Sequence, residues 1–170
     1  GGNRVFKAKV YSSIIGYRAK LELILKDDGL IVARIPGSPV DIPIITLMRA
    51  LGLESDKEIA SAISLNDQIQ NELEGSFEKT EIATSKDAIV YISKRIAPGM
   101  LEEFQIKRAE TLLDWGLLPH LGKQPENRKE KTQFLGEAAC KLLELKLGWI
   151  EPDDKDHYGN KVVKFAGQML

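Results

Sequence analysis

The sequence has few of the residues that build metal centres and disulfide frameworks. Among its 170 residues there are one cysteine, Cys140, and two histidines, His120 and His157. A single thiol cannot pair within the chain, and no spacing of Cys and His fits a structural zinc site. We therefore expect neither disulfides nor zinc, and we interpret Cys140 as a small hydrophobe on the apolar face of a helix. His120 follows an apolar run, and we expect it to pack or cap at a helix end.

Long hydrophobic runs and enzyme signatures are also missing. The longest largely apolar run, Ile42 to Met48, is far shorter than the roughly 20 residues that cross a bilayer. No secretory signal opens the chain, so we expect an intracellular protein with no membrane partner. The phosphate-loop, nucleophile-elbow, zinc-protease and dinucleotide patterns are absent too. The sequence therefore predicts no catalytic residue and no cofactor.

The charge is close to neutral in total but unevenly spread. A chain of this length, with 43% hydrophobic residues and a net charge of −1, is typical of one soluble globular domain over residues 1–170. The first 20 residues hold five bases and no acid, whereas residues 53–90 hold nine acids and three bases. This asymmetry is compatible with a basic face for nucleic acid. It also fits an ordinary solvated surface.

The first third of the chain alternates apolar and polar residues, as half-buried strands do. In RVFKAKVY the polar positions include Lys7 and Lys9, and KLELILK repeats the pattern. The turn Asp27 to Gly29 predicts a hairpin before LIVARI. We expect an antiparallel sheet of about three strands within residues 3–36, with lysines on its exposed face.

Residues 43–150 carry helix signals. Pro43 suits a first helical turn and Gly52 suits the position after a helix. Three segments with capping-box spacing, SDKE at Ser55, SLND at Ser64 and TSKD at Thr84, predict three further helix starts. Strands first and helices afterwards indicate an α+β domain.

Apolar stripes and aromatic residues complete the expected core. In the helix opened by SLND, one stripe is expected to contain Leu65, Ile69, Leu73 and Phe77. Two longer helices are expected at roughly 101–115 and 126–147, the second with an apolar face wide enough to cross the core. Trp115 and Trp149 fall at helix ends, where we expect them to anchor the core.

The terminal stretch of residues 151–170 is unusually polar. It contains DDKDHYGNKVVKFAG, from Asp153 to Gly167. Asp153, Asp154 and Asp156 could hold a hard cation, but neighbouring side chains point in different directions. We favour a capped turn in which the aspartates bond backbone amides and Gly159 takes a positive φ. The final FAGQML is expected to begin an apolar helix.

Four ordered stretches resemble the second-largest subunit of multisubunit RNA polymerases, most closely its archaeal and eukaryotic forms. They are DIPIITLMRALGLESDKEI (Asp41 to Ile59), LLPHLG (Leu117 to Gly122), KTQFLGEAACKLLELKLG (Lys131 to Gly148) and DDKDHYGNKVVKFAG. The signature residues match position by position over His157, Tyr158, Gly159, Asn160 and Lys161. The family has a second base after this lysine, whereas this chain has Val162.

The resemblance implies the lobe region of that subunit, an α+β domain on one wall of the DNA cleft. It further implies that Mg²⁺ and nucleotide addition belong to other domains of the polymerase. The Gly1-Gly2 start has the composition of a cloning remnant, and we expect the chain to be a piece of a longer polypeptide. Expected partners are other polymerase subunits, DNA, and initiation or elongation factors. The expected location is the cytoplasm for an archaeal form and the nucleus for a eukaryotic one.

Two functions remain open at this point. The first is a DNA-facing structural domain, with Lys161, Lys164, Asn160, Lys7 and Lys9 as candidate DNA contacts and Asp154, Asp156, His157, Tyr158 and Gly159 as the structural motif. The second is a helical protein-interaction domain whose acidic middle binds a basic partner without meeting DNA. The first predicts that the bases of the sheet and of the terminal turn share one face.

Overall fold

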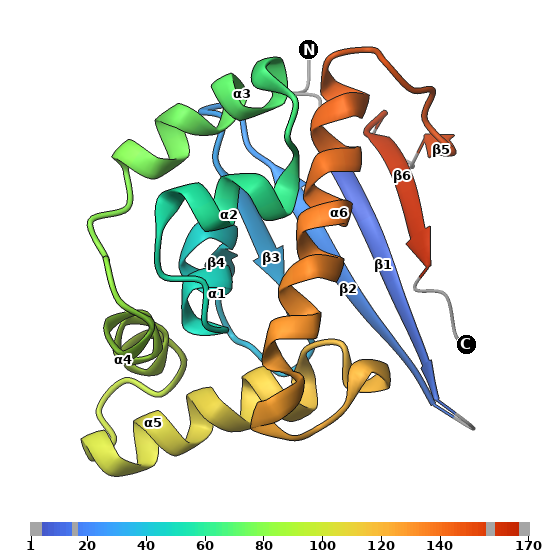
Figure 1. The fold of residues 1–170 in the computed structure, drawn as a ribbon. Coiled ribbons are helices and arrows are strands. Elements are labelled where there is room, and N and C mark those ends of the chain that lie inside the picture. Colours follow the sequence, from blue (N-terminus) through green and yellow to red (C-terminus); the bar gives the residue numbers. More distant parts are fainter. Residues whose placement is uncertain (1–4, 15–16, 156–158, 167–170) are drawn as a thin grey trace.

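The computed structural model describes residues 5–14, 17–155 and 159–166. Within them, a six-stranded mixed sheet is covered by helices (Figure 1). The strands are β1 (Phe6–Ile14), β2 (Tyr17–Leu25), β3 (Ile31–Arg34), β4 (Ile42–Pro43), β5 (Asp154–Lys155) and β6 (Lys161–Ala166). The helices are α1 (Ile44–Ala50), α2 (Asp56–Ile63), α3 (Asp67–Glu78), α4 (Ser85–Ile96), α5 (Glu102–Thr111) and α6 (Arg128–Lys146). The α+β class is confirmed.

The predicted N-terminal antiparallel sheet is present and is larger than expected. β1 pairs antiparallel with β2, and β2 pairs antiparallel with β3 across the Asp27–Gly29 turn. Gly29 has φ +87°, and the Leu30 amide donates to Asp28 Oδ1 at 3.0 Å. β4 extends one edge of the sheet, and the C-terminal strands β6 and β5 extend the other, in the order β4-β3-β2-β1-β6-β5.

The expected helix start at FAGQML is wrong for its first two residues. Phe165 and Ala166 belong to β6, which runs parallel to β1 with Val10 opposite Phe165. The strand forms because β1 has a free edge that needs backbone partners, a requirement that no local pattern records. Residues 167–170 of the same stretch lie outside the described residues.

Two of the three predicted helix caps are confirmed. Ser55 Oγ accepts from the Glu58 amide at 3.0 Å, and Thr84 Oγ1 accepts from the Asp87 amide at 3.1 Å. The SLND start is displaced: Asn66, not Ser64, caps α3, and its Oδ1 accepts from the amides of residues 68 and 69. Leu65 therefore precedes the helix and is 81% exposed rather than part of the buried stripe.

The other boundaries agree with the predicted signals to within a turn. Pro43 caps α1 from β4 instead of lying in its first turn, and Gly52 follows the helix with φ +122°. α5 ends in one π-helical turn, Leu112–Gly116, and α6 is preceded by a 3₁₀ turn, Pro125–Asn127.

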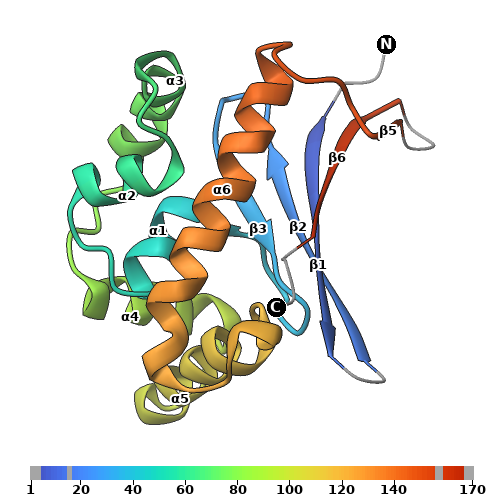
Figure 2. The same cartoon turned by 45° about the vertical axis from the view of Figure 1, so that its right-hand side comes forward.

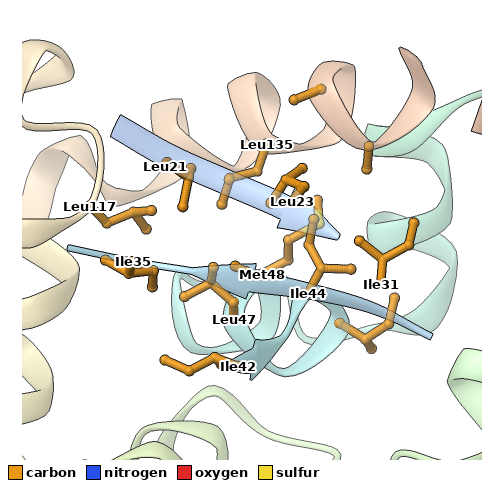
Figure 3. Packing of buried hydrophobic residues seen from close by; sticks show 14 of the residues in the cluster. Leu21, Leu23, Ile31, Ile35, Ile42, Ile44, Leu47, Met48, Leu117 and Leu135 are labelled. Atoms are coloured by element: carbon orange, nitrogen blue, oxygen red, sulfur yellow. The ribbon is translucent and has the colours of Figure 1, made fainter. Parts of the chain in front are cut away.

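Helix α6 crosses the inner face of the sheet and organises the core. Figure 3 shows Leu135 of this helix beside Leu21 and Leu23 of β2, with Met48 of α1 close by; all four side chains are buried. The approach of α6 to α2 depends on Gly136, because a Cβ there would overlap the backbone carbonyl of Ala62. This gives a physical reason for the glycine in the FLG motif.

A buried lysine holds the π-helical turn against α6. Lys131 is fully buried, and its Nζ donates to the carbonyl oxygens of Leu113 at 2.8 Å and Asp114 at 3.0 Å. Arg128, one turn earlier in α6, makes two hydrogen bonds of 2.8 Å to the Asp114 carboxylate. Burial lowers the pKa of Lys131 to about 8, although the Asp114 charge acts in the opposite direction.

The predicted core role of the two tryptophans is wrong. Trp115 is 59% exposed and Trp149 is 44% exposed. Trp115 lies in the π-helical turn, whose wider geometry leaves its side chain outside the core, and the Lys123 Nζ lies 4.6 Å from its ring centroid. Trp149 follows Gly148, where φ of +76° turns the chain away after α6.

The roles expected for His120 and Cys140 agree with the structure. His120 packs edge-to-face on Phe134 with 5.3 Å between ring centroids, and burial together with the charge of Lys131 lowers its pKa. Cys140 packs against the core, and burial with nearby Glu144 raises the pKa of its thiol. A raised pKa disfavours the reactive thiolate.

Candidate nucleic-acid interface

The helices cover one face of the sheet and leave the other face open. Figure 2 shows the helices gathered on one side, with β1 and β6 at the opposite boundary of the molecule. Alternate residues of a strand point to opposite faces. Ala8, Val10 and Val163 therefore belong to the covered side and join the main hydrophobic cluster. Lys7 and Lys9 lie on the open side.

Strand register aligns charged residues across the open face. Lys9 of β1 is opposite Glu22 of β2 and also opposite Lys164 of β6. Glu22 is in turn opposite Arg34 of β3. Directly opposed residues share a face, so these four side chains form one row across four strands. We call the bases of this side the open basic face, which comprises Lys7, Lys9, Lys20, Arg34 and Lys164.

Two of these bases are already neutralised by acids. Lys20 Nζ lies 2.9 Å from Glu22 Oε1, and Arg34 Nε lies 3.1 Å from Asp41 Oδ1. Burial alone would raise the pKa of Glu22, but the hydrogen bond from Lys20 and the surrounding positive charges lower it below its ordinary value. Glu22 therefore stays ionised among the lysines.

Lys9 and Lys164 are two bases of this face whose ammonium groups can contact a partner. The side chain of Lys164 is exposed and that of Lys9 is partly exposed. Among the residues that the structure describes, neither ammonium group has an ion pair with a carboxylate. β1 and β6 thus contribute bases to one face. The DNA-facing hypothesis also requires the base of the terminal turn, Lys161, to lie there.

Lys161 lies on the other side of the terminal strand. It is three residues before Lys164, so its side chain points to the opposite face of β6. It is partly buried, and its Nζ lies 5.8 Å from the ring centroid of Phe6. The structure therefore does not bring Lys161 together with the open basic face.

Asn160 ties the end of the chain to its beginning. Its side chain is only 6% exposed, and its Oδ1 accepts from the Val5 amide at 3.1 Å. This places the amide inside the junction of β1 and β6. Asn160 is therefore not part of the exposed surface formed by Lys9 and Lys164.

The terminal turn has the backbone conformation expected of a capped turn. Gly159 has φ +79°, and the Asp153 carboxylate accepts from the Lys164 amide at 2.7 Å. Asp154 belongs to β5, and its backbone pairs with that of Val162 in β6. Asp156, His157 and Tyr158, which complete the motif, lie outside the described residues.

Within the described part of the chain, no group of three or more His, Cys, Asp or Glu side chains is arranged to hold a metal ion. No helix within the same residues combines the length and the apolar character needed to span a bilayer.

Sequence reasoning missed Arg34 and Glu22 as members of the charged row. The sequence contains the signal that places them there. The Asp27–Gly29 turn sets the register of β2 with β3, and this register puts Arg34 opposite Glu22. The contribution of Lys164 depended on β6 joining the sheet and had no such local signal.

Comparison with known proteins identifies the family. The fold first defines the class, an α+β domain whose mixed sheet is covered by helices on one face. The sequence matches the family described as RNA polymerase Rpb2, domain 2, over residues 2–164, and the chain belongs to this family. It is a region of the second-largest type of RNA polymerase subunit.

Archaeal relatives cover nearly the whole chain. It is 42% identical to the DNA-directed RNA polymerase subunit Rpo2 of Saccharolobus solfataricus, over 100% of this chain and 15% of that protein. It is 44% identical to subunit Rpo2N of Methanococcus vannielii, over 96% of this chain and 34% of the relative. For Rpo2N of Halobacterium salinarum the identity is 36%, over 99% of this chain and 33% of the relative. The chain thus spans between 15% and 34% of these relatives' length.

Proposed function

We propose that this chain is a structural lobe of a DNA-directed RNA polymerase that lines the DNA cleft. In this role it helps to hold downstream DNA and offers surfaces to transcription factors. It carries no catalytic residue itself, and Mg²⁺ and nucleotide addition belong to other parts of the enzyme. Its partners are the other polymerase subunits and DNA, and its location is cytoplasmic.

The open basic face is the observation that carries this proposal. Lys9 and Lys164 occupy neighbouring strands of a sheet face that the helices leave open (Figure 2). Lysines so placed can meet phosphates without first losing an ion pair. Phosphate contacts of this kind position a duplex without reading its sequence. A wall that must slide along any DNA needs contacts of this kind.

The number of unpaired bases limits the affinity of this surface. Because Lys20 and Arg34 are paired with acids, few phosphate contacts are available, and we expect the chain alone to bind duplex DNA weakly. The expected dissociation constant is roughly 10⁻⁴ M or weaker at physiological salt, and binding should weaken steeply with added salt. Useful affinity then requires the other DNA-binding surfaces of the assembled enzyme.

The test is a double substitution in the assembled polymerase. Lys9→Ala with Lys164→Ala should make elongation complexes dissociate at lower salt, and the slope of log affinity against log salt should shrink by about 0.9 for each lost phosphate contact. The matched control is Lys57→Ala with Lys86→Ala, two exposed bases on α2 and α4. Equal effects of the two doubles, or no effect of the first, would remove the DNA-facing assignment.

A second candidate function rests on an acidic groove between α2 and α3. The groove has a volume of about 660 Å³, and its lining includes Asp56, Asp67 and Glu74 against the single base Lys57. It suits a basic protein segment. Asp67→Lys with Glu74→Lys would abolish that binding and leave the salt response of DNA complexes unchanged.

A further inference from the structure

Exposed apolar side chains are concentrated at helix α5. Leu101, which caps its start, is 70% exposed, and Phe104 in its first turn is 50% exposed. Met100 before it is 47% exposed, and Trp115 in the π-helical turn after it is 59% exposed. Large apolar residues that cluster on a surface mark interaction sites, whereas isolated ones need no explanation.

Trp115 forms part of a groove between this helix and the loop after β3. The groove has a volume of about 270 Å³, and its lining includes Ile96, Leu112, Trp115, Pro36 and Gly37. At the turn, a Cβ on Gly116 would lie 3.1 Å from the Pro36 carbonyl oxygen. The loop and the turn are therefore in close approach, and an inserted side chain would meet apolar groups from both.

The groove is preformed, because buried charges fix the turn that bears Trp115. Lys131 Nζ donates hydrogen bonds to the carbonyl oxygens of Leu113 and Asp114, and Arg128 donates to the Asp114 carboxylate. Asp114 immediately precedes Trp115 in the chain. A site held in this way needs little ordering when it binds, which favours affinity.

The charges along the groove select the partner. Arg108 and Thr111 are polar lining residues, and the Lys123 ammonium lies over the ring of Trp115. Among the described residues, the Arg108 guanidinium has no ion pair. Its charge is therefore available to a carboxylate, which an arginine fork binds through paired hydrogen bonds.

We propose that this groove binds a protein segment in which an apolar side chain lies next to carboxylates. The apolar side chain would enter between Trp115 and Pro36, and a carboxylate would bind Arg108. Protein is favoured over nucleic acid because most of the residues that line the groove are apolar and Arg108 is the one base among them, whereas a nucleic acid needs several bases for its phosphates. The proposal does not depend on the DNA-facing role of the sheet, which lies on different elements.

The experiment places a photo-reactive benzoylphenylalanine in the assembled polymerase. One version replaces Thr111, an exposed residue that lines the groove, and a control version replaces Leu65, which is exposed before α3. The probe is a short fluorescein-labelled peptide in which Asp and Glu flank a central Leu-Phe pair. Labelling at position 111 should exceed labelling at position 65 by at least about fivefold.

Three controls test whether the labelling reports binding in this groove. Arg108→Glu and Trp115→Ala should each lower the labelling at position 111 by at least about fivefold. A peptide with Ser-Ser in place of Leu-Phe should not label this position. Lys9→Ala with Lys164→Ala should leave the labelling unchanged, which separates this site from the proposed DNA face. Equal labelling at positions 111 and 65, insensitivity to Arg108→Glu, or competition by oligothymidine as effective as by unlabelled peptide would each overturn the proposal.

Discussion

Lysines on the two sides of the sheet lie in opposite surroundings. Under the helices, Lys131 has no exposed surface and donates to two backbone carbonyl oxygens. On the open face, Lys164 is exposed and its side chain has no ion pair within the described residues. A buried charge must be satisfied inside the fold, whereas an exposed one costs little to place and stays available. Substitutions on the helix side should therefore change stability, and those on the open face should change binding.

The largest effect is expected on the helix side, at Gly136. Gly136→Ala would force the new Cβ into the Ala62 carbonyl, so α2 and α6 must separate. We expect the free energy of unfolding, measured by urea titration of the chain, to fall by about 4 kcal/mol. The matched control is Gly75→Ala in α3, where a Cβ meets nothing within 4 Å. There alanine should raise stability by roughly 0.5–1 kcal/mol, and a loss at both sites would refute the packing explanation.

Next in size is the loss of the buried lysine itself. Lys131→Ala leaves the carbonyl oxygens of Leu113 and Asp114 without their donor and opens a cavity. The expected loss is about 3 kcal/mol in the same urea titration. Lys129→Ala changes an exposed lysine of the same helix and should stay within about 0.5 kcal/mol of the parent. Similar losses for the two would show that Lys131 is not a structural donor.

The pH dependence sharpens the contrast further. The pKa of Lys131 is lowered from 10.5 to about 8, so between these values the unfolded chain binds the proton that the folded chain has released. The free energy of unfolding should therefore rise with pH across that window, by up to about 1.4 kcal/mol per pH unit. Below pH 8 this contribution is constant. The measurement is the difference between the parent and Lys131→Met, and a flat difference from pH 8 to 10.5 would contradict the lowered pKa.

A smaller effect is expected at the terminal turn. Gly159 has φ +79° and open space around its Cα, so alanine adds backbone strain without a clash. Gly159→Ala should lower the free energy of unfolding by about 1 kcal/mol. A thermal melt of the chain provides the measurement. An unchanged melting temperature would mean that the turn accommodates alanine without backbone strain.

The smallest stability effect belongs to the open basic face. Lys9→Ala with Lys164→Ala removes partly or fully exposed charges and should change the free energy of unfolding by less than about 0.5 kcal/mol. The same double is the one expected to weaken DNA complexes in the assembled polymerase. If the melting temperature of the double variant falls as far as that of Gly159→Ala, these lysines have a structural role instead.

Local sequence patterns predicted the parts of the fold that local physics determines. The alternation around Lys7 and Lys9 gave the strand and its exposed face, and Ser55 and Thr84 capped helices because a hydroxyl oxygen can reach nearby amides. The cap of α3 was misplaced because Asn66 competes with Ser64 and accepts from two amides. Propensity alone does not rank two such neighbours.

Tertiary features were predicted less well, for identifiable reasons. β6 fills an edge created by a strand at the other end of the chain, so no window of sequence around Phe165 contains its partner. Trp115 is expected in the core from its position at a helix end, yet it lies exposed in the π-helical turn. Burial of Lys131 could have been noticed, because it lies one helical turn before Leu135 on the buried face of α6.

The parallel pairing of the first and last described strands has a mechanical consequence. β1 and β6 run side by side from Phe6 opposite Lys161 to Tyr11 opposite Ala166. If a longer polypeptide pulls on the start of β1 and the end of β6, the two parallel strands are drawn past each other along their length. The hydrogen bonds between the two strands then carry the force together, so they do not break one after another. Such a shear joint resists tension between the two ends of the domain.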